Sequence, residues 1–130
     1  MSSIFTKIIN GDIPCFKVAE NDDFLAFLDI TPLRKGHVLV VPKIETDYIF
    51  DINDSELGDM FIFSKMVALK IKKVFPCKRI GVTVIGLEVP HAHIHLIPIN
   101  KESDMNFRNP KLKPTNEEMI QIASEIRKNL

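Results

Sequence analysis

No charge of either sign predominates in this sequence, in which 17 lysines and arginines balance 17 aspartates and glutamates. The chain therefore lacks the overall positive field that attracts nucleic acid, and we expect no nucleic-acid partner. It also has no apolar run long enough to cross a membrane, and its first residues lack the basic and then apolar pattern of a signal peptide. These absences predict a cytoplasmic protein without a membrane partner.

Cysteine is scarce as well. Cys15 and Cys77 are the only two cysteines, and they form no Cys-x-x-Cys pair. We expect both to be free thiols in a reducing compartment. With 130 residues, of which 45% are hydrophobic and 26% charged, the chain is long enough for one domain with its own core but not for two. We therefore predict a single domain over residues 1–130.

Local patterns predict an α+β fold, in which about five antiparallel strands form a meander and one long helix packs on the sheet. The patterns do not determine the order of the strands in the sheet. The strands are predicted at 16–20, 24–29, 36–42, 79–85 and 90–98. The helices are predicted at 4–9, from Asn53 or Asp54 to Val74, and at the C-terminus after a Thr115 and Glu118 capping box. That last helix has apolar residues at Met119, Ile122, Ala123, Ile126 and Leu130. Residues 100–114 show little periodicity and are predicted to form a loop.

The long helix has apolar residues on two sides. One row at helical spacing contains Leu57, Met60, Phe61, Ser64, Val67, Ala68 and Ile71, and a second contains Ile62, Met66 and Leu69, with Phe63 beside it. One row would pack on the sheet. In a domain of this size the second row indicates another subunit, and we predict a homodimer.

Three of the four histidines lie at alternate positions in the segment His91-Ala92-His93-Ile94-His95. Alternate residues of a strand share one face, so this spacing predicts a row of imidazoles on one face and an apolar row on the other. Imidazole titrates near neutral pH and can act as acid, base, nucleophile or metal ligand. A solvent-facing polar row is the plain alternative, but three histidines in register favour a functional site.

This segment resembles the His-φ-His-φ-His-φ-φ signature, in which φ is apolar, of the histidine triad (HIT) family of nucleotide hydrolases and transferases. Residues 3–14, 26–32 and 36–43 are similar to its upstream blocks in their usual order, and the likeness is closest to the bacterial, nucleotide-binding (HINT-like) members. The resemblance implies the family's fold, a homodimer, and hydrolysis or transfer at the α-phosphate of nucleoside phosphoramidates or related conjugates. It also implies a covalent nucleotidyl-histidine intermediate and no cofactor.

The resemblance assigns catalytic roles to the four histidines. His93 matches the nucleophile, while His91 and His95 are implied to hydrogen-bond phosphate oxygens. His95 is also implied to assist proton transfer to the leaving group. His37 matches a fourth histidine that orients the triad.

The resemblance also implies a site for a nucleotide, with a purine expected. Asp29 matches the acid that binds the ribose hydroxyls, although an aspartate two residues before Thr31 and Pro32 can equally open a turn. The apolar pocket for the base is matched by Phe5, Ile8, Phe27 and Ile30, which otherwise would be ordinary core residues. Leu28, Gly86 and Glu88 complete the predicted substrate-binding residues.

The chain departs from parts of the family pattern. Ser3 and Thr6 occupy positions at which some branches carry a zinc-binding Cys-x-x-Cys, so that site is not expected. Leu87 and Glu88 replace a Gln-Ser pair that contacts phosphate in the purine phosphoramidase branch, so the preferred leaving group does not follow from the resemblance.

The sequence leaves three alternatives open. The triad and His37, with Glu88 as a carboxylate ligand, could instead bind a divalent metal. The protein could hydrolyse dinucleoside polyphosphates. It could also bind nucleotides without catalysing a reaction.

Overall fold

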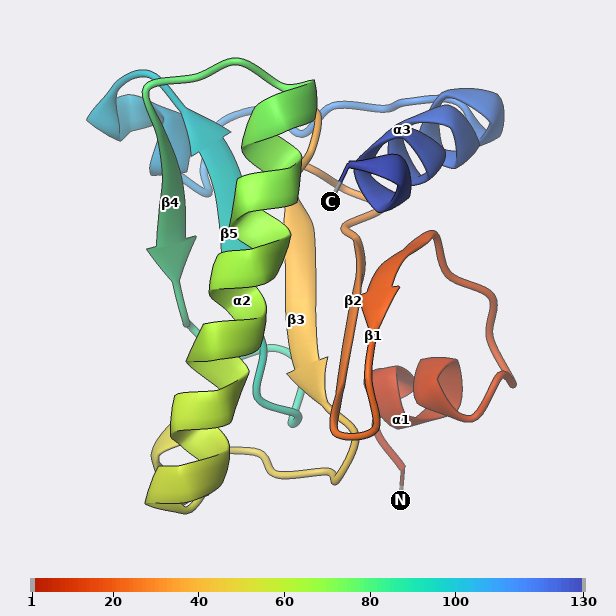
Figure 1. Ribbon diagram of the computed structural model, residues 1–130, viewed down its shortest axis with the longest axis vertical. Helices are drawn as coiled ribbons and strands as arrows, with labels where there is room; N and C mark the ends of the chain where they lie inside the picture. The colour runs from red at the N-terminus through yellow and green to blue at the C-terminus, as the bar shows by residue number, and fades with distance from the viewer. Residues whose placement is uncertain (1, 130) are drawn as a thin grey trace.

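The computed structural model describes residues 2–129. Five strands form one antiparallel sheet in the order β1-β2-β3-β5-β4, and the long helix α2 lies along one face of it (Figure 1). The strands are β1 (Lys17–Glu20), β2 (Phe24–Leu28), β3 (Val38–Pro42), β4 (Arg79–Thr83) and β5 (Ile94–Ile99). The helices are α1 (Ile4–Ile9), α2 (Asp54–Val74) and α3 (Asn116–Lys128), with two short 3-10 helices, η1 (Ile49–Asp51) and η2 (Glu102–Met105). The predicted α+β fold is confirmed.

The last two strands depart from a simple meander. Strand β5 pairs with both β3 and β4, so β4 lies at the edge of the sheet although it precedes β5 in the chain. Leu39 of β3 lies opposite His95 of β5. The histidine-bearing strand therefore runs beside β3, which begins one residue after His37.

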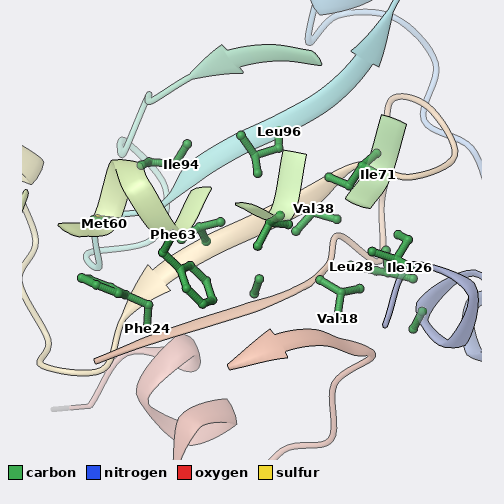
Figure 2. Packing of buried hydrophobic residues seen from close by; sticks show 14 of the residues in the cluster. Val18, Phe24, Leu28, Val38, Met60, Phe63, Ile71, Ile94, Leu96 and Ile126 are labelled. Atoms are coloured by element: carbon green, nitrogen blue, oxygen red, sulfur yellow. The ribbon is translucent and has the colours of Figure 1, made fainter. Parts of the chain in front are cut away.

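Alternation along the strands divides the buried residues into two clusters on opposite faces of the sheet. The larger cluster lies between the sheet and helices α2 and α3. Figure 2 shows part of it, with Phe24, Val38, Ile94 and Leu96 of the sheet packed against Met60, Phe63 and Ile71 of α2. The smaller cluster contains Phe5 of α1 with Leu25, Phe27, Leu39 and Val41. Because both faces are covered, every residue of β2 and β3 is buried.

The histidine strand begins later than predicted. Residues 90–93 are not part of β5, which starts at Ile94. The amide of Ala92 instead donates to the carbonyl of Thr46 at 2.7 Å. The predicted alternation nevertheless holds, since Ala92, Ile94 and Leu96 all belong to the larger cluster. An extended backbone alternates its side chains whether or not it pairs with a neighbouring strand.

Helix α2 begins as its capping residue predicts, with the Asn53 side chain accepting a hydrogen bond from the Glu56 amide at 2.8 Å. One assignment on this helix was wrong: Phe63 is buried and Phe61 is 45% exposed, the reverse of the prediction. Phe63 lies three residues after Met60 and four before Val67, which places it on their face. Of the helices in residues 2–129, none is long and apolar enough to cross a membrane.

The C-terminal region follows the prediction in part. The Thr115 hydroxyl accepts from the Glu118 amide and the Glu118 carboxylate accepts from the Thr115 amide, both at 3.1 Å, which is the predicted capping box of α3. Leu130, predicted on the apolar face of this helix, lies outside the described residues. The predicted loop at 100–114 contains the helix η2.

The second apolar row of α2 is exposed, which supports the predicted homodimer. Ile62 is 70% exposed and Leu69 57% exposed. We expect Ile62→Glu to dissociate the protein into monomers, because a carboxylate in an apolar interface loses its hydration. Light scattering of the wild type and the variant at micromolar concentration measures this.

A matched control is Ile120→Glu on α3, where the replaced isoleucine is 53% exposed. This variant should keep the oligomeric state of the wild type. A monomeric wild type would show that the exposed row of α2 is not a dimer interface.

Candidate active site

A cavity of about 570 Å³ opens beside α1, at the end of β2 and the start of β5. All but two of the residues predicted for the site border it: Phe5, Ile8, Phe27, Leu28, Asp29, Ile30, Gly86, Glu88, His93 and His95. The exceptions are His37 and His91, which the structure places in contact with His95 and His93 without bringing them to the cavity wall. Leu28 belongs to the larger core cluster as well.

The hydrogen bond of His93 determines which of its nitrogens is free. Its Nδ1 lies 2.8 Å from the main-chain oxygen of His91. A carbonyl can only accept, so Nδ1 carries the ring proton and Nε2 keeps its lone pair. The ring of Phe5 packs edge-on against His93 with 5.0 Å between centroids. Nε2 of His93 has no hydrogen-bond partner, and among the described residues every fully buried side-chain nitrogen has one. This Nε2 is therefore not fully buried, and it is accessible from the cavity that His93 borders.

The tautomer of His95 follows from a chain of hydrogen bonds. The Leu33 amide donates to Nδ1 of His37 at 3.1 Å, so the His37 proton is on Nε2. That Nε2 lies 2.9 Å from Nδ1 of His95 and donates to it. His95 therefore carries its own proton on Nε2. The rings of His93 and His95 are 5.0 Å apart, so the cavity receives a lone pair from one and an N–H from the other.

Burial keeps this pair of histidines neutral. Desolvation is the main cause that lowers the pKa of His37 to about 4 and that of His95 to about 3. The negative charge of Asp29 opposes both shifts without cancelling them. A second proton on His37 would also have to displace the hydrogen bond from Leu33. Both rings are therefore neutral at pH 7.

His91 departs from its predicted role. It is fully buried and does not border the cavity, so it is not placed to contact a phosphate. Its Nε2 donates to the Pro42 carbonyl at 2.8 Å, and its Nδ1 accepts from the Ser3 hydroxyl at 2.7 Å. Burial lowers its pKa. With both ring nitrogens occupied, His91 holds in place the main-chain oxygen that bonds to His93.

The partners of His91 were not predicted. Ser3 caps α1 by accepting from the Thr6 amide at 3.0 Å, and its own amide donates to Glu45 at 2.7 Å. The Thr6 hydroxyl also donates to Glu45, at 2.6 Å. These hydrogen bonds lower the pKa of Glu45 to about 2, and the bond from the Thr6 hydroxyl makes the largest contribution. Ser3 and Thr6, where no zinc-binding cysteine pair was expected, thus belong to a hydrogen-bond network. The carboxylate of this network, Glu45, lies 42 residues beyond Ser3 in sequence.

Asp29 forms a turn and also faces the histidines. Its Oδ1 accepts from the Thr31 amide at 2.9 Å and from the Thr31 hydroxyl at 3.1 Å. Its Oδ2 lies 3.6 Å from Nε2 of His37. The turn former and the predicted ribose acid are therefore compatible, because the turn occupies one carboxylate oxygen and leaves the other at the cavity.

The geometry does not favour the metal alternative. The predicted ligand set is not assembled, because both nitrogens of His91 and Nδ1 of His93 make hydrogen bonds within the protein. Asp29, His37 and His95 do place one ligand atom each within 4.8 Å of one another. A metal on Nε2 of His37 would require the ring proton on Nδ1, where it would meet the Leu33 amide proton. The arrangement fits a hydrogen bond donated from His37 to His95 better than a metal cation.

Two cavity residues come from the segment at 100–114 that was predicted only as a loop. Phe107 packs edge-on against His95 with 4.9 Å between centroids, and Lys111 borders the cavity beside it. The buried carboxylate of Asp104 anchors this segment by accepting from the Asn100 amide at 2.9 Å. No periodicity or motif marks Phe107 or Lys111, since they reach the site only through the path of the folded loop.

Comparison with known proteins agrees with the fold. Residues 10–102 match the model of the HIT domain. This chain belongs to the HIT family. It is 36% identical over 128 residues to a Schizosaccharomyces pombe HIT-like relative named adenosine 5'-monophosphoramidase hnt1, with 97% of this chain and 96% of the relative covered. A Saccharomyces cerevisiae protein of the same name, HNT1, is 38% identical over 100 residues, with 76% of this chain and 63% of the relative covered.

Among solved structures, a HIT-like protein from Bartonella henselae superimposes with a TM-score of 0.85 at 30% identity, over 99% of this chain and 97% of that one. The predicted family is therefore confirmed, and the five-stranded antiparallel sheet with its helices is the HIT fold.

We expect Ser3→Ala to destabilise the HIT fold by roughly 1–3 kcal/mol beyond the loss of a helix cap, because it removes the hydroxyl that donates to the buried Nδ1 of His91 at 2.7 Å. The Thr6 hydroxyl lies 3.5 Å from this nitrogen but donates to Glu45. Urea unfolding measures the free energy. The control is Asn53→Ala, which removes the capping side chain of α2 and no buried partner. Equal losses in the two variants would show that Ser3 acts only as a cap.

The free energy of unfolding should fall as the pH is lowered from 7 to 5. His37 and His95 have an unfolded pKa near 6.5 and a lower folded pKa, so in this range the unfolded chain binds more protons and acid favours it. The loss begins below about pH 7 and continues until the pH passes the folded pKa values, about 4 for His37 and about 3 for His95. We expect each histidine to account for a loss on the order of 2 kcal/mol by pH 5.

The variant His37→Gln/His95→Gln should show a flatter dependence over this range, in which most unfolded carboxylates are still ionised. Resonances of the two imidazoles in the wild type should not titrate above pH 5. Titration of both rings near pH 6.5 would contradict the assignment of a buried neutral pair.

Proposed function

We propose that this protein is a hydrolase of the nucleoside phosphoramidase type, which cleaves purine nucleotide conjugates at the α-phosphate through a nucleotidyl-His93 intermediate. One observation carries the proposal: His93 presents a lone pair and His95 an N–H to the same cavity, with their rings 5.0 Å apart. The two relatives named adenosine 5'-monophosphoramidase support the reaction class.

The nucleoside would lie at the apolar end of the cavity. Phe5 and Phe27 pack edge-to-face there with 5.6 Å between centroids, and Ile8 lies beside them. Aromatic and aliphatic surfaces accept any base, so we expect weak discrimination between bases. The free Oδ2 of Asp29 can accept a hydrogen bond from a ribose hydroxyl. These contacts would place the α-phosphate next to His93.

In the first step Nε2 of His93 forms a bond to phosphorus and the bond from phosphorus to the leaving nitrogen breaks. The electron pair of that bond goes to the nitrogen, which needs a proton. An anionic phosphate near His95 favours the charged form of this imidazole, so a proton from solvent would add to its Nδ1 once the substrate is bound. The hydrogen bond from Nε2 of His37 would have to open to admit that proton. Nε2–H of His95 then protonates the departing amine. The nucleotidylated His93 keeps the proton on Nδ1, which donates to the His91 carbonyl.

In the second step water attacks the phosphorus and the electron pair of the bond to nitrogen returns to Nε2 of His93. The proton of the water goes to His95, which had given one up in the first step. Each cycle consumes one water and restores both histidines. Hydrolysis of a dinucleoside polyphosphate would use the same two steps with a different leaving group, whereas a non-catalytic module would bind nucleotide and show no turnover.

We expect His93→Ala to abolish turnover of adenosine 5'-phosphoramidate and to leave the affinity for AMP within a few-fold of the wild type. The base pocket and Asp29 remain in this variant. His95→Asn should retain slow turnover, reduced by roughly 10²–10³, since one hydrogen-bond donor is lost. Chromatographic detection of AMP and calorimetric titration measure the two quantities.

Wild-type turnover should persist in EDTA, and rapid quenching with mass spectrometry should detect a nucleotide on His93. Near wild-type turnover by His93→Ala would refute the nucleophile. Activity that is lost in EDTA and restored by zinc would favour the metal alternative, and AMP binding without turnover would favour the non-catalytic one.

A further inference from the structure

Lys111 carries a positive charge to the cavity wall without a counter-ion. Its half-buried ammonium donates to the main-chain carbonyls of Phe107 and Asn109, the latter at 3.3 Å, and lies 5.8 Å from the centre of the Phe107 ring. These partners are all neutral. Within residues 2–129 no carboxylate forms an ion pair with it. An ammonium that is partly removed from water and unpaired favours an anion beside it.

The position of Lys111 puts this charge on the His95 side of the cavity. Phe107 lies between them, with its ring 4.9 Å from that of His95 and under the Lys111 ammonium. The charge of Lys111 also helps to lower the pKa of His37, so its field reaches the histidine pair. His93, in contrast, packs against Phe5 at the apolar end.

Phosphoryl transfer places the attacking and the leaving atoms roughly in line on opposite sides of the phosphorus. With His93 as the attacking group and His95 as the donor to the leaving atom, the side that carries Phe107 and Lys111 is the side of the leaving group. The segment before the triad supplies no cation there, because Leu87 is apolar and Glu88 is acidic. Of the described side chains that border the cavity, only Lys111 is a lysine or arginine.

We propose that Lys111, held over the Phe107 ring, forms a subsite that selects nucleotide conjugates whose leaving group carries a negative charge close to the scissile bond. A phosphoryl group and the carboxylate of an amino acid joined through its amine are two such groups. The subsite rests on the proposed function for the position of the α-phosphate at His93.

A binding experiment tests the subsite without requiring turnover. The affinities for AMP and for the non-hydrolysable α,β-methylene analogue of ADP are compared by calorimetry. The wild type should bind the analogue roughly 5- to 20-fold more tightly than AMP, as expected for a charge-assisted hydrogen bond that is partly screened by solvent. Lys111→Met should abolish this ratio and Lys111→Arg should retain it. Lys113→Met, an exposed lysine of the same segment that does not border the cavity, should match the wild type.

A second experiment compares kcat/KM for AMP joined through its phosphorus to the amine of glycine and to that of glycinamide. The wild type should favour the glycine conjugate, whose carboxylate faces Lys111, and Lys111→Met should treat the two alike. A Lys111-dependent preference in only one of the two experiments would restrict the subsite to phosphoryl or to carboxylate groups.

The two proposals fail in different ways. Absence of turnover with either conjugate would overturn the proposed function, while the affinity ratio still reports on Lys111. Equal turnover of both conjugates together with equal affinity for AMP and the analogue would overturn the subsite and leave the hydrolase in place. A ratio that Lys111→Met leaves unchanged would likewise overturn it.

Discussion

Main-chain groups fix the protonation of the four histidines, and the proposed chemistry depends on them. The Pro42 carbonyl accepts a hydrogen bond from Nε2–H of His91, and the His91 carbonyl accepts one from Nδ1–H of His93. The Leu33 amide forces the proton of His37 onto Nε2, which in turn sets the tautomer of His95. Side-chain rings can rotate, but these carbonyl and amide groups are held by the fold. The direction of each proton is therefore a property of the folded backbone.

The sheet brings these main-chain groups together. Pro42 ends β3, Leu33 lies in the turn that leads into β3, and His91 lies just before β5, the partner of β3. Ala92, Ile94 and Leu96 are buried in the larger core cluster, which fixes the register of the histidines between them. A slip of one residue would turn the imidazoles into the larger cluster and the apolar row toward the opposite face of the sheet, so the core opposes it. The packing under α2 and the orientation of the histidines are two effects of one alternating pattern.

The sequence pattern could predict the faces of the triad but not its environments. Alternation assigned His91, His93 and His95 to one face even though only His95 lies within β5. It could not separate His91 from the other two, because its buried state depends on Ser3 and Pro42, which are distant in sequence. Long-range contacts of this kind leave no local periodicity.

The same limit applies to the two charged groups that the sequence did not indicate. Glu45 is exposed and Lys111 lies in an aperiodic segment, so neither differs in sequence from an ordinary surface residue. On α2, in contrast, the sequence predicted both apolar rows correctly. Only the assignment of Phe61 and Phe63 to the buried and the exposed row was reversed. Local spacing identifies amphipathic faces, and the folded chain decides which charges meet a cavity.

The proposed reaction makes two opposite demands on His95, and the surrounding charges would reconcile them. Burial keeps its pair with His37 neutral, whereas protonation of a leaving amine requires a proton on it. Asp29 raises the pKa of His37 and Lys111 lowers it, so the two charges oppose each other at the pair. An anionic leaving group beside Lys111 would neutralise the lysine and leave Asp29 and the phosphate to favour the charged imidazole. In this arrangement a substrate with an anionic leaving group would increase the proton affinity of His95, the residue that has to protonate that leaving group. The selection of the leaving group and its protonation would then be linked.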